Sequence, residues 1–410
     1  MIDKPRRPLL SLMLLTASAA VFFWITAGEP SAQVSTPSPV TIDERSFSLR
    51  ERLGFRLFFD TNLSEPAGQS CASCHDPTKA FTGNNGSTIG VALGSRPGTF
   101  GTRDTPTAMY LATAPALGSI EKDGKRVPAG GLFWDGRAQS LEEQAKGPFF
   151  NPLEMNNAGT AQLIAKIANG PYAAEFRKEW GEGIFGQPEA ALDAVAASIA
   201  AFERTRVFQP FTSKFDFVMR GQAQFTEQEQ RGLSLFTIRQ KGNCAACHTV
   251  DEASRDPAKS LFTDFSYHAL GAPRSTRIPR NADITFNDLG LCERAPMSGK
   301  QPVRDENHCG LFKTPTLRNI ALTAPYMHNG VFDNLRDVVA FYATRDTDPG
   351  KWYSSGKKFN DLPSIFHVNV DVETPPYQRR AKQRPQLNDE EISDIVAFLH
   401  TLTDGYKPKP

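Results

Sequence analysis

Two short stretches, Cys71-Ala72-Ser73-Cys74-His75 and Cys244-Ala245-Ala246-Cys247-His248, decide how this chain of 410 residues is interpreted. Each stretch follows an apolar segment of the form Gly-x-x-Leu-Phe, at residues 54–58 and 232–236. An apolar segment and then a Cys-x-x-Cys-His motif therefore occur once in each half. Because self-similarity along a chain indicates repeated structural units, the sequence predicts two related halves.

Cys-x-x-Cys-His is the motif to which c-type haem is attached covalently. The two thiols form thioether bonds to the two vinyl groups, and the adjacent imidazole binds the iron. A zinc knuckle and a redox-active dithiol are the alternative interpretations of such a motif. Two copies in one chain favour two covalent haems. The expected attachment cysteines and axial histidines are Cys71, Cys74 and His75 in the first half, and Cys244, Cys247 and His248 in the second.

The composition is that of a folded chain with many turns. Hydrophobic residues make up 40% and charged residues 22%, which is typical of globular rather than disordered proteins. The 46 basic and 45 acidic residues leave a net charge of +1, so no nucleic-acid partner is expected. The 31 glycines and 30 prolines predict long loops.

The N-terminus has the pattern of a targeting segment. Lys4, Arg6 and Arg7 precede an uncharged, mostly apolar run over residues 8–28. Residues 1–28 are therefore expected to be a secretory signal peptide or a membrane anchor. The Ser/Pro/Thr-rich residues 29–41 are expected to be a linker, and the remainder of the chain is expected to be exported.

The fold is predicted to be mainly α, with two cytochrome c-like haem domains and long loops. Apolar residues recur at helical spacing over residues 192–202 and again over 392–399. Asn388 and Glu391 match a capping box at the start of the second of these helices. No convincing alternating strands are expected beyond short stretches. The predicted domains span residues 42–215 and 216–410.

The remaining cysteines, Cys292 and Cys309, lie in a Gly/Pro-rich stretch. In an exported protein they are expected to form a disulfide, and a pair of free thiols is the alternative. Closing so short a loop contributes about 3 kcal/mol in the chain-entropy model, so the expected role is structural.

The first half offers no second histidine as an iron ligand. The next histidine after His75 is His248, and the Gly/Ser/Thr-rich loop over residues 83–103 contains no strong iron ligand. The first haem is therefore expected to be five-coordinate or water-bound, which is the configuration that binds peroxide.

Three further motifs connect the chain to a known family. They are Phe133-Trp134-Asp135-Gly136-Arg137, Asn151-Pro152-Leu153-Glu154-Met155, and Thr314-Pro315-Thr316-Leu317-Arg318-Asn319 running into residues 322–330. With both Cys-x-x-Cys-His motifs, they resemble the bacterial di-haem cytochrome c peroxidases and the related tryptophan-modifying enzyme MauG. The resemblance covers residues 42–405. It implies a periplasmic protein, soluble or tethered, with a peroxide-binding N-terminal domain and an electron-transfer C-terminal domain.

The resemblance also assigns roles to residues of the first half. Glu154 matches the distal acid/base carboxylate, which moves a proton from one peroxide oxygen to the other. Gln144 and Pro148 match residues that line the same pocket. Trp134 matches the indole that lies between the two haems and carries electrons. The alternatives are a surface charge for Glu154 and core packing for Trp134.

A bound calcium ion between the haems is implied as well. Its matching ligands are Asp104 and the backbone carbonyl groups of Thr323 and Pro325, and hard oxygen donors suit Ca²⁺. The family commonly has Asn where this chain has Asp104, and a carboxylate binds calcium at least as well. The alternative is that Asp104 caps a turn before Thr105 and Pro106.

The second haem departs from the peroxidase pattern. Peroxidases of the family use a Met as its sixth ligand, but no Met follows Met327 in this chain. Tyr342 stands at the matching position, as in MauG-like members. Phenolate is a hard anionic donor that favours oxidised iron and lowers its potential. Met327, His328 and Met297 are the competing ligands, and a buried aromatic without metal contact is the alternative.

Three functions from different classes follow. The first is a peroxidase that reduces hydrogen peroxide with electrons from a small redox protein, a cytochrome c or a cupredoxin. The second is a MauG-like enzyme that uses peroxide to oxidise a protein or another large substrate. The third is a non-catalytic electron carrier or haem sensor. The open first iron and Glu154 argue against the third, and Tyr342 favours the second.

Overall fold

The computed structural model describes Met1 and residues 42–295, 297, 304–354 and 356–408. The predicted signal or anchor segment and linker lie outside the described residues. No helix in the described ranges is long and apolar enough to cross a membrane.

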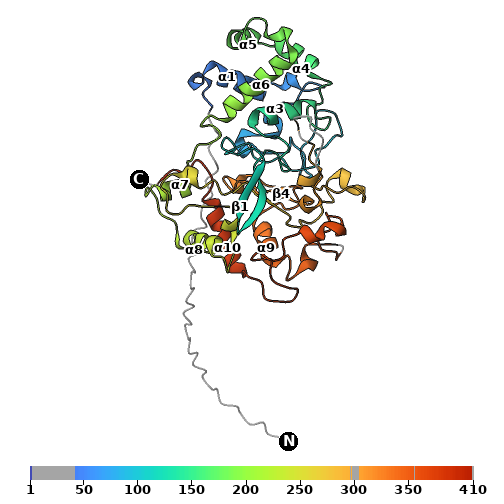
Figure 1. Ribbon diagram of the computed structural model, residues 1–410. Helices are drawn as coiled ribbons and strands as arrows, with labels where there is room; N and C mark the ends of the chain where they lie inside the picture. The colour runs from blue at the N-terminus through green and yellow to red at the C-terminus, as the bar shows by residue number, and fades with distance from the viewer. Residues whose placement is uncertain (2–41, 296, 298–303, 355, 409–410) are drawn as a thin grey trace. The chain divides into compact units, whose positions relative to one another are not determined.

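Helices dominate the N-terminal half (Figure 1). They are α1 (Leu49–Phe59), α2 (Cys71–Cys74), α3 (Leu141–Phe150), α4 (Thr160–Ala168), α5 (Ala173–Trp180) and α6 (Pro188–Glu203). The first of them begins at a capping box, in which Ser48 accepts from the Glu51 backbone and the Glu51 carboxylate accepts from the Ser48 backbone. Helix α6 contains the predicted apolar run and packs against α1, α3 and α4.

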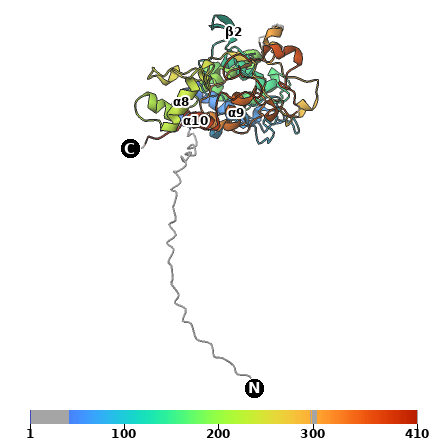
Figure 2. The ribbon, with the colours of Figure 1, turned by 90° about the horizontal axis from the view of Figure 1, so that it is seen from below.

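The C-terminal half repeats this plan with fewer helices. They are α7 (Lys214–Met219), α8 (Glu227–Thr237), α9 (Leu335–Thr344) and α10 (Asp389–His400), and the second motif is a 3₁₀ turn, η5 (Cys244–Ala246). Helix α10 packs against α8 and α9 (Figures 1 and 2). The predicted capping box of Asn388 and Glu391 opens α10, so that prediction is confirmed.

The repeated glycine has the same structural purpose in both halves. A Cβ atom at Gly54 of α1 would lie 1.9 Å from the carbonyl oxygen of Ser198 of α6. A Cβ at Gly232 of α8 would lie 2.0 Å from the carbonyl oxygen of Asp394 of α10. Each half therefore brings the helix before the motif into backbone contact with its closing helix, and only glycine permits this approach.

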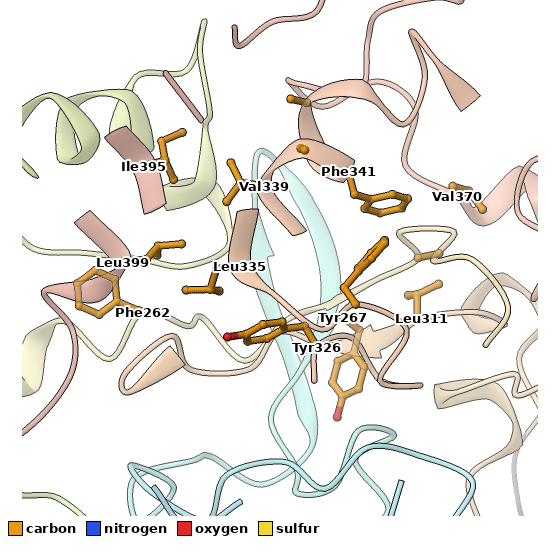
Figure 3. Packing of buried hydrophobic residues seen from close by; sticks show 14 of the residues in the cluster. Phe262, Tyr267, Leu311, Tyr326, Leu335, Val339, Phe341, Val370, Ile395 and Leu399 are labelled. Carbon is orange, nitrogen blue, oxygen red and sulfur yellow. The ribbon is translucent and has the colours of Figure 1, made fainter. Parts of the chain in front are cut away.

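Each half has its own hydrophobic cluster. One is built from residues between Leu53 and Phe208, and the other from residues between Phe215 and Leu402. In the second cluster, Leu335 and Val339 of α9 lie opposite Ile395 and Leu399 of α10 (Figure 3). The fold class is mainly α, as expected, and the domain boundary at residues 215/216 stays a prediction.

A β-hairpin is the element that the sequence analysis missed. Strands β1 (Gly118–Lys122) and β2 (Lys125–Ala129) pair in antiparallel register, and Asp123 and Gly124 form the turn with positive φ. Asp-Gly is a strong hairpin signal that was available in the sequence. Ala129 continues into a bridge with Ser266, next to the short pair β3 (Tyr267–His268) and β4 (Phe312–Lys313). The hairpin therefore links the two halves.

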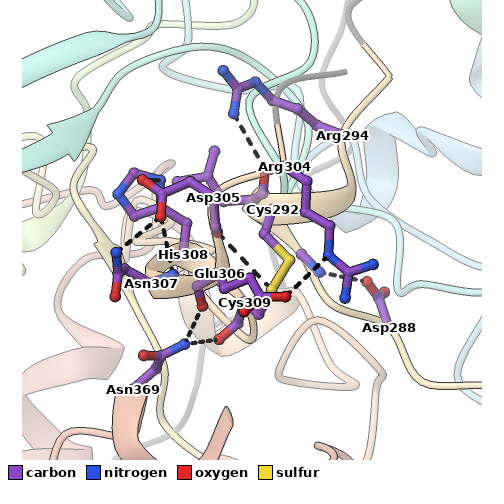
Figure 4. The surroundings of a disulfide bond; sticks show 12 residues. Asp288, Cys292, Arg294, Arg304, Asp305, Glu306, Asn307, His308, Cys309 and Asn369 are labelled. Atoms are coloured by element: carbon purple, nitrogen blue, oxygen red, sulfur yellow. Dashed lines mark hydrogen bonds and ion pairs between the residues drawn. A yellow bond between two sulfur atoms is a disulfide. The ribbon is translucent and has the colours of Figure 1, made fainter. Parts of the chain in front are cut away.

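Cys292 and Cys309 form the predicted disulfide (Figure 4). Both residues are fully buried. The Asn369 side-chain amide donates hydrogen bonds to the carbonyl oxygens of Glu306 and Cys309, at 2.8 and 3.0 Å. The disulfide thus fastens a loop of the C-terminal half to its surroundings.

Candidate active site

The two Cys-x-x-Cys-His motifs have matching histidine geometry. His75 Nδ1 donates to the carbonyl oxygen of Phe81 at 2.8 Å, and His248 Nδ1 donates to that of Phe262 at 2.9 Å. Both phenylalanines are fully buried and have a φ of 54°. A hydrogen bond at Nδ1 leaves Nε2 as the nitrogen available to a metal. Burial lowers the pKa of both imidazoles, which keeps them in the neutral, metal-binding form.

The first motif opens into a cavity of the N-terminal half. Cys71, Cys74 and His75 line this cavity, which we call the N-cavity. The residues predicted for the distal pocket also line it: Gln144 and Pro148 of α3, and Glu154 of the loop after α3. The structure therefore brings the predicted pocket residues together with the first motif, while their chemical roles stay predictions.

Glu154 lies in an environment suited to proton transfer. Its Oε1 accepts a hydrogen bond from Asn151 Nδ2 at 2.7 Å. Burial raises the pKa of the Glu154 carboxyl, and the Arg137 guanidinium and the Asn151 hydrogen bond act in the opposite direction. A carboxyl with a raised pKa is a better proton acceptor than an exposed one.

The second motif opens into a cavity of the C-terminal half, which we call the C-cavity. Tyr342 projects from α9 and lines it together with Cys244, Cys247 and His248. Burial raises the pKa of the Tyr342 phenol, so the free side chain is neutral. The Tyr377 ring lies 5.8 Å from the Tyr342 ring, centroid to centroid.

The competing ligands differ in position. Met327 and His328 also line the C-cavity. The His328 ring stacks on Phe312 at 3.6 Å, and its Nε2 lies 3.6 Å from a carboxylate oxygen of Asp361. Met297 instead packs beside Phe133, against a small cluster of the N-terminal half. Among the three competitors, only the first two share a cavity with His248.

One segment and one side chain form the wall between the cavities. Residues 104–107 and Trp134 line both of them. The Trp134 indole Nε1 donates to the carbonyl oxygen of Asp104 at 2.9 Å, and the Trp134 carbonyl oxygen accepts from the backbone N–H of Lys313 at 2.9 Å. Contacts from both halves therefore fix the indole in this wall.

The predicted calcium ligands share a neighbourhood. Asp104, Thr323 and Pro325 all line the C-cavity. Asp104 is 7% exposed, and burial raises the pKa of its carboxyl well above the usual range. Its backbone N–H donates to the carbonyl oxygen of His328 at 2.8 Å. A buried carboxylate is costly unless a cation balances it, so the chemistry of this donor set fits a hard cation.

Comparison with known proteins agrees with this geometry. A profile of the family described as di-haem cytochrome c peroxidase matches residues 48–224. The methylamine utilization protein MauG of Paracoccus denitrificans is 37% identical, over 87% of this chain and 89% of that protein. The chain belongs to the di-haem cytochrome c peroxidase family. It is therefore an oxidoreductase of the di-haem peroxidase type with two c-type haems.

Other members of this family cover nearly the whole chain. The cytochrome c551 peroxidase of Nitrosomonas europaea is 31% identical, over 96% of this chain and 89% of that protein. The crystal structure of the diheme peroxidase BthA from Burkholderia thailandensis is 40% identical, covers 89% of both chains and has a TM-score of 0.81. A solved tyrosine-to-methionine variant of BthA has a TM-score of 0.82.

The residues of this family member fit the two haems. Each cavity combines two thiols, a neutral imidazole and a largely apolar lining. The four motif cysteines are not in disulfides, so they are available for thioether formation. Burial raises the pKa of Cys74 to about 12 and that of Cys247 to about 11, so the unattached thiols are neutral at physiological pH.

The sequence analysis did not single out several residues at these cavities. His268 lines the C-cavity, with its Nε2 3.3 Å from Cys247 Sγ and 2.8 Å from Ser266 Oγ. Lys122, near the hairpin turn, donates to Asp264 at 2.6 Å and reaches Cys247 at 3.7 Å. The Lys122 contacts depend on how the hairpin crosses to the other half, and the contact between His268 and Cys247 joins residues 21 apart in the sequence, so no local pattern predicts either.

Glu203, which lines the N-cavity, could have been identified from the sequence, because a local signal for it was present. It ends an apolar helical run and is buried at 6% exposure. A charged residue on the buried face of a helix is unusual enough to mark a candidate site.

Proposed function

We propose that this enzyme reduces hydrogen peroxide in the N-cavity with electrons that enter through the C-terminal half. The single observation that carries this proposal is the position of half-buried Glu154 in the same cavity as His75. When bound, each haem supplies a redox-active iron, and an iron without a sixth protein ligand is open to peroxide.

Glu154 is the group that moves the proton during O–O cleavage. Its carboxylate takes the proton from one peroxide oxygen and returns it to the other, which leaves as water. The Asn151 amide holds one carboxylate oxygen by its 2.7 Å hydrogen bond and so fixes the direction of the other. Gln144 and Pro148 restrict the space in which peroxide lies.

Electrons cross between the halves at Trp134. Its indole belongs to the wall that both cavities share, and its hydrogen bond to Asp104 limits its motion. The Ca²⁺ ion that we propose at Asp104, Thr323 and Pro325 would bind beside this wall. It would hold the segment that carries Asp104 against the C-terminal half.

The partner and the compartment follow from the same proposal. The electron donor is a small redox protein, a cytochrome c or a cupredoxin, and the compartment is the periplasm. The N-terminal segment either is removed or tethers the enzyme to the inner membrane.

A second candidate function is MauG-like oxidation of a protein or another large substrate. Tyr342 favours it, since this residue lines the C-cavity where peroxidases of the family would present a Met. A phenolate ligand favours oxidised iron, so the C-terminal half would share an oxidising equivalent with the N-terminal half.

Rapid mixing of the fully oxidised holoenzyme with stoichiometric peroxide tests the proposal. We expect an oxidised state to form without prior reduction, and we expect Glu154→Gln to slow its formation by about 100-fold. Glu189→Gln, an exposed change on α6, is the matched control and should react as the parent does. Equal rates for Glu154→Gln and the parent would remove Glu154 from the mechanism.

Steady-state assays then separate the two candidates. Rapid turnover with a reduced cytochrome or cupredoxin supports the peroxidase. A long-lived oxidised state that small donors discharge slowly supports the MauG-like enzyme.

A further inference from the structure

A second buried acid lies in the N-cavity and has no part in the mechanism above. Glu203 is the last residue of α6 and lines the cavity together with Ile199, one helical turn earlier. It is 6% exposed, and its Oε2 is buried without a hydrogen-bond partner among the described residues. An unpartnered buried carboxyl oxygen is costly, so its retention calls for a physical reason.

A surface ion pair lies close to Glu203. The next residue, Arg204, donates to both carboxylate oxygens of Glu142, at 2.6 and 3.1 Å. The side chains of this ion pair are 44% and 37% exposed. Glu142 belongs to α3, the helix that also carries the cavity-lining Gln144, and the charges of Arg204 and Glu142 both act on the Glu203 carboxyl.

Within the N-cavity, Glu203 shares the lining with Glu154 and with Cys71 of the first motif. Glu154 follows the end of α3 and Glu203 ends α6, so the two acids reach the N-cavity from different elements. Burial raises the pKa of Glu203 to about 8, with Arg204 lowering and Glu142 raising it, so the carboxyl is protonated at neutral pH.

The reaction needs such a proton source. Reduction of one hydrogen peroxide to two waters consumes two electrons and two protons. Glu154 only transfers a proton between the two peroxide oxygens, so it supplies none to the net reaction. Both protons must enter a cavity whose acids are shielded from water.

We propose that Glu203 is a proton-relay residue that connects solvent at the Glu142–Arg204 pair with the N-cavity. Twice in each catalytic cycle its O–H bond breaks, and the proton goes to the second peroxide-derived oxygen, which leaves as water once the donor protein has supplied two electrons. After each transfer the carboxylate takes a new proton from solvent. This inference rests on the proposed reduction of peroxide. The relay acts while the oxidised enzyme is being reduced, since that half of the cycle consumes the protons.

Three holoenzyme variants test the relay: Glu203→Gln, Glu203→Asp and the α6 control Glu189→Gln. For Glu203→Gln we expect about 10-fold or more slower turnover and a larger solvent isotope effect, because the exchangeable acid is gone. The reaction with stoichiometric peroxide should stay within about two-fold of the parent, since O–O cleavage needs no net proton. Glu203→Asp should recover part of the turnover, and the control should match the parent.

Infrared spectroscopy gives a readout that does not depend on turnover. A protonated carboxyl has a C=O band that shifts in D₂O. We expect this band in the resting parent and in Glu154→Gln, and its loss in Glu203→Gln. Since Asp104 and Glu154 also have raised pKa values, the difference spectrum between the parent and Glu203→Asp tests the protonated state if Glu203→Gln fails to accumulate, and absence of a difference band overturns the proposal.

Unchanged turnover and isotope effect in Glu203→Gln would also overturn the relay. Failure of the proposed function gives a different pattern, in which the parent does not react with stoichiometric peroxide at all.

Discussion

The two halves of this enzyme use one scaffold to build two different reaction environments. In each, a glycine brings a helix against the closing helix, a Cys-x-x-Cys-His motif follows, and a buried phenylalanine carbonyl accepts from the histidine. The other residues that line the two cavities differ. The N-cavity presents the carboxyls of Glu154 and Glu203, whereas the C-cavity presents the phenol of Tyr342.

This difference shows which parts of the repeated fold are the same in both halves and which parts differ. The repeated parts are the glycine contact between helices and the Cys-x-x-Cys-His motif, and they fix the positions of a histidine and two thiols. Their close backbone contacts leave little room for substitution. Glu154 comes from the loop after α3 and Glu203 from α6, whereas Tyr342 comes from α9. Side chains at these positions can change without disturbing the shared glycine contacts, which is consistent with the separate roles that we propose for the two cavities.

The largest expected effect is the loss of one haem when the motif of one half is changed. Cys71→Ala should leave the haem of the C-terminal half attached, and Cys244→Ala should leave that of the N-terminal half, because each motif attaches its own. Pyridine haemochrome spectra of purified protein should give a haem-to-chain ratio that falls by half in each variant. Loss of both haems from a single change would contradict independent halves.

Exchanging Tyr342, which we propose as the ligand in the C-cavity, should make the second half resemble that of an ordinary peroxidase. We expect Tyr342→Met to raise the midpoint potential of one haem by on the order of 0.1 V, because thioether favours reduced iron. Redox titration followed by absorbance measures this change. Tyr353→Phe is the control, because Tyr353 is a buried tyrosine that does not line the C-cavity; its hydroxyl donates to the carbonyl oxygen of Gly271. A potential unaffected by Tyr342→Met would assign the ligand to Met327 or His328.

The shared scaffold predicts matched losses of stability. Gly54→Ala and Gly232→Ala each force a methyl group against a backbone carbonyl oxygen, so each should lower the free energy of unfolding by about 1–3 kcal/mol. Denaturant unfolding of the holoenzyme measures both. Gly183→Ala, where a Cβ meets nothing within 4 Å, should have little effect. A large loss in only one half would show that the two helix contacts are not equivalent.

The smallest expected effect is a pH dependence confined to the N-cavity. The pKa of Glu203 is raised from 4.5 to about 8, so the folded enzyme keeps a proton that the unfolded chain releases. The stability from this group is fully present below pH 4.5 and is lost as the pH rises through 8. Glu203→Gln should therefore flatten the decline of Tm between pH 6 and 9, and an unchanged decline would contradict the raised pKa.

Much of the fold and part of the site were predictable because their signals are local. Each haem motif consists of five contiguous residues. The apolar spacing of α6 and α10 and the capping box at Asn388 likewise involve only residues within a few helical turns of one another. The β1–β2 hairpin was missed although its Asp-Gly turn was visible, because its strands are short and mostly exposed.

The sequence by itself determined the two Cys-x-x-Cys-His motifs, from which two haems and their attachment residues are predicted, and the absence of a Met beyond Met327. Only the tertiary structure decided which side chains face those positions. Packing between segments far apart in the chain places Trp134 in the lining of both cavities. It also places Glu203 together with Glu154 in the lining of the N-cavity. Covalent attachment needs neighbours in sequence, whereas proton and electron transfer need neighbours in space, and only folding supplies those.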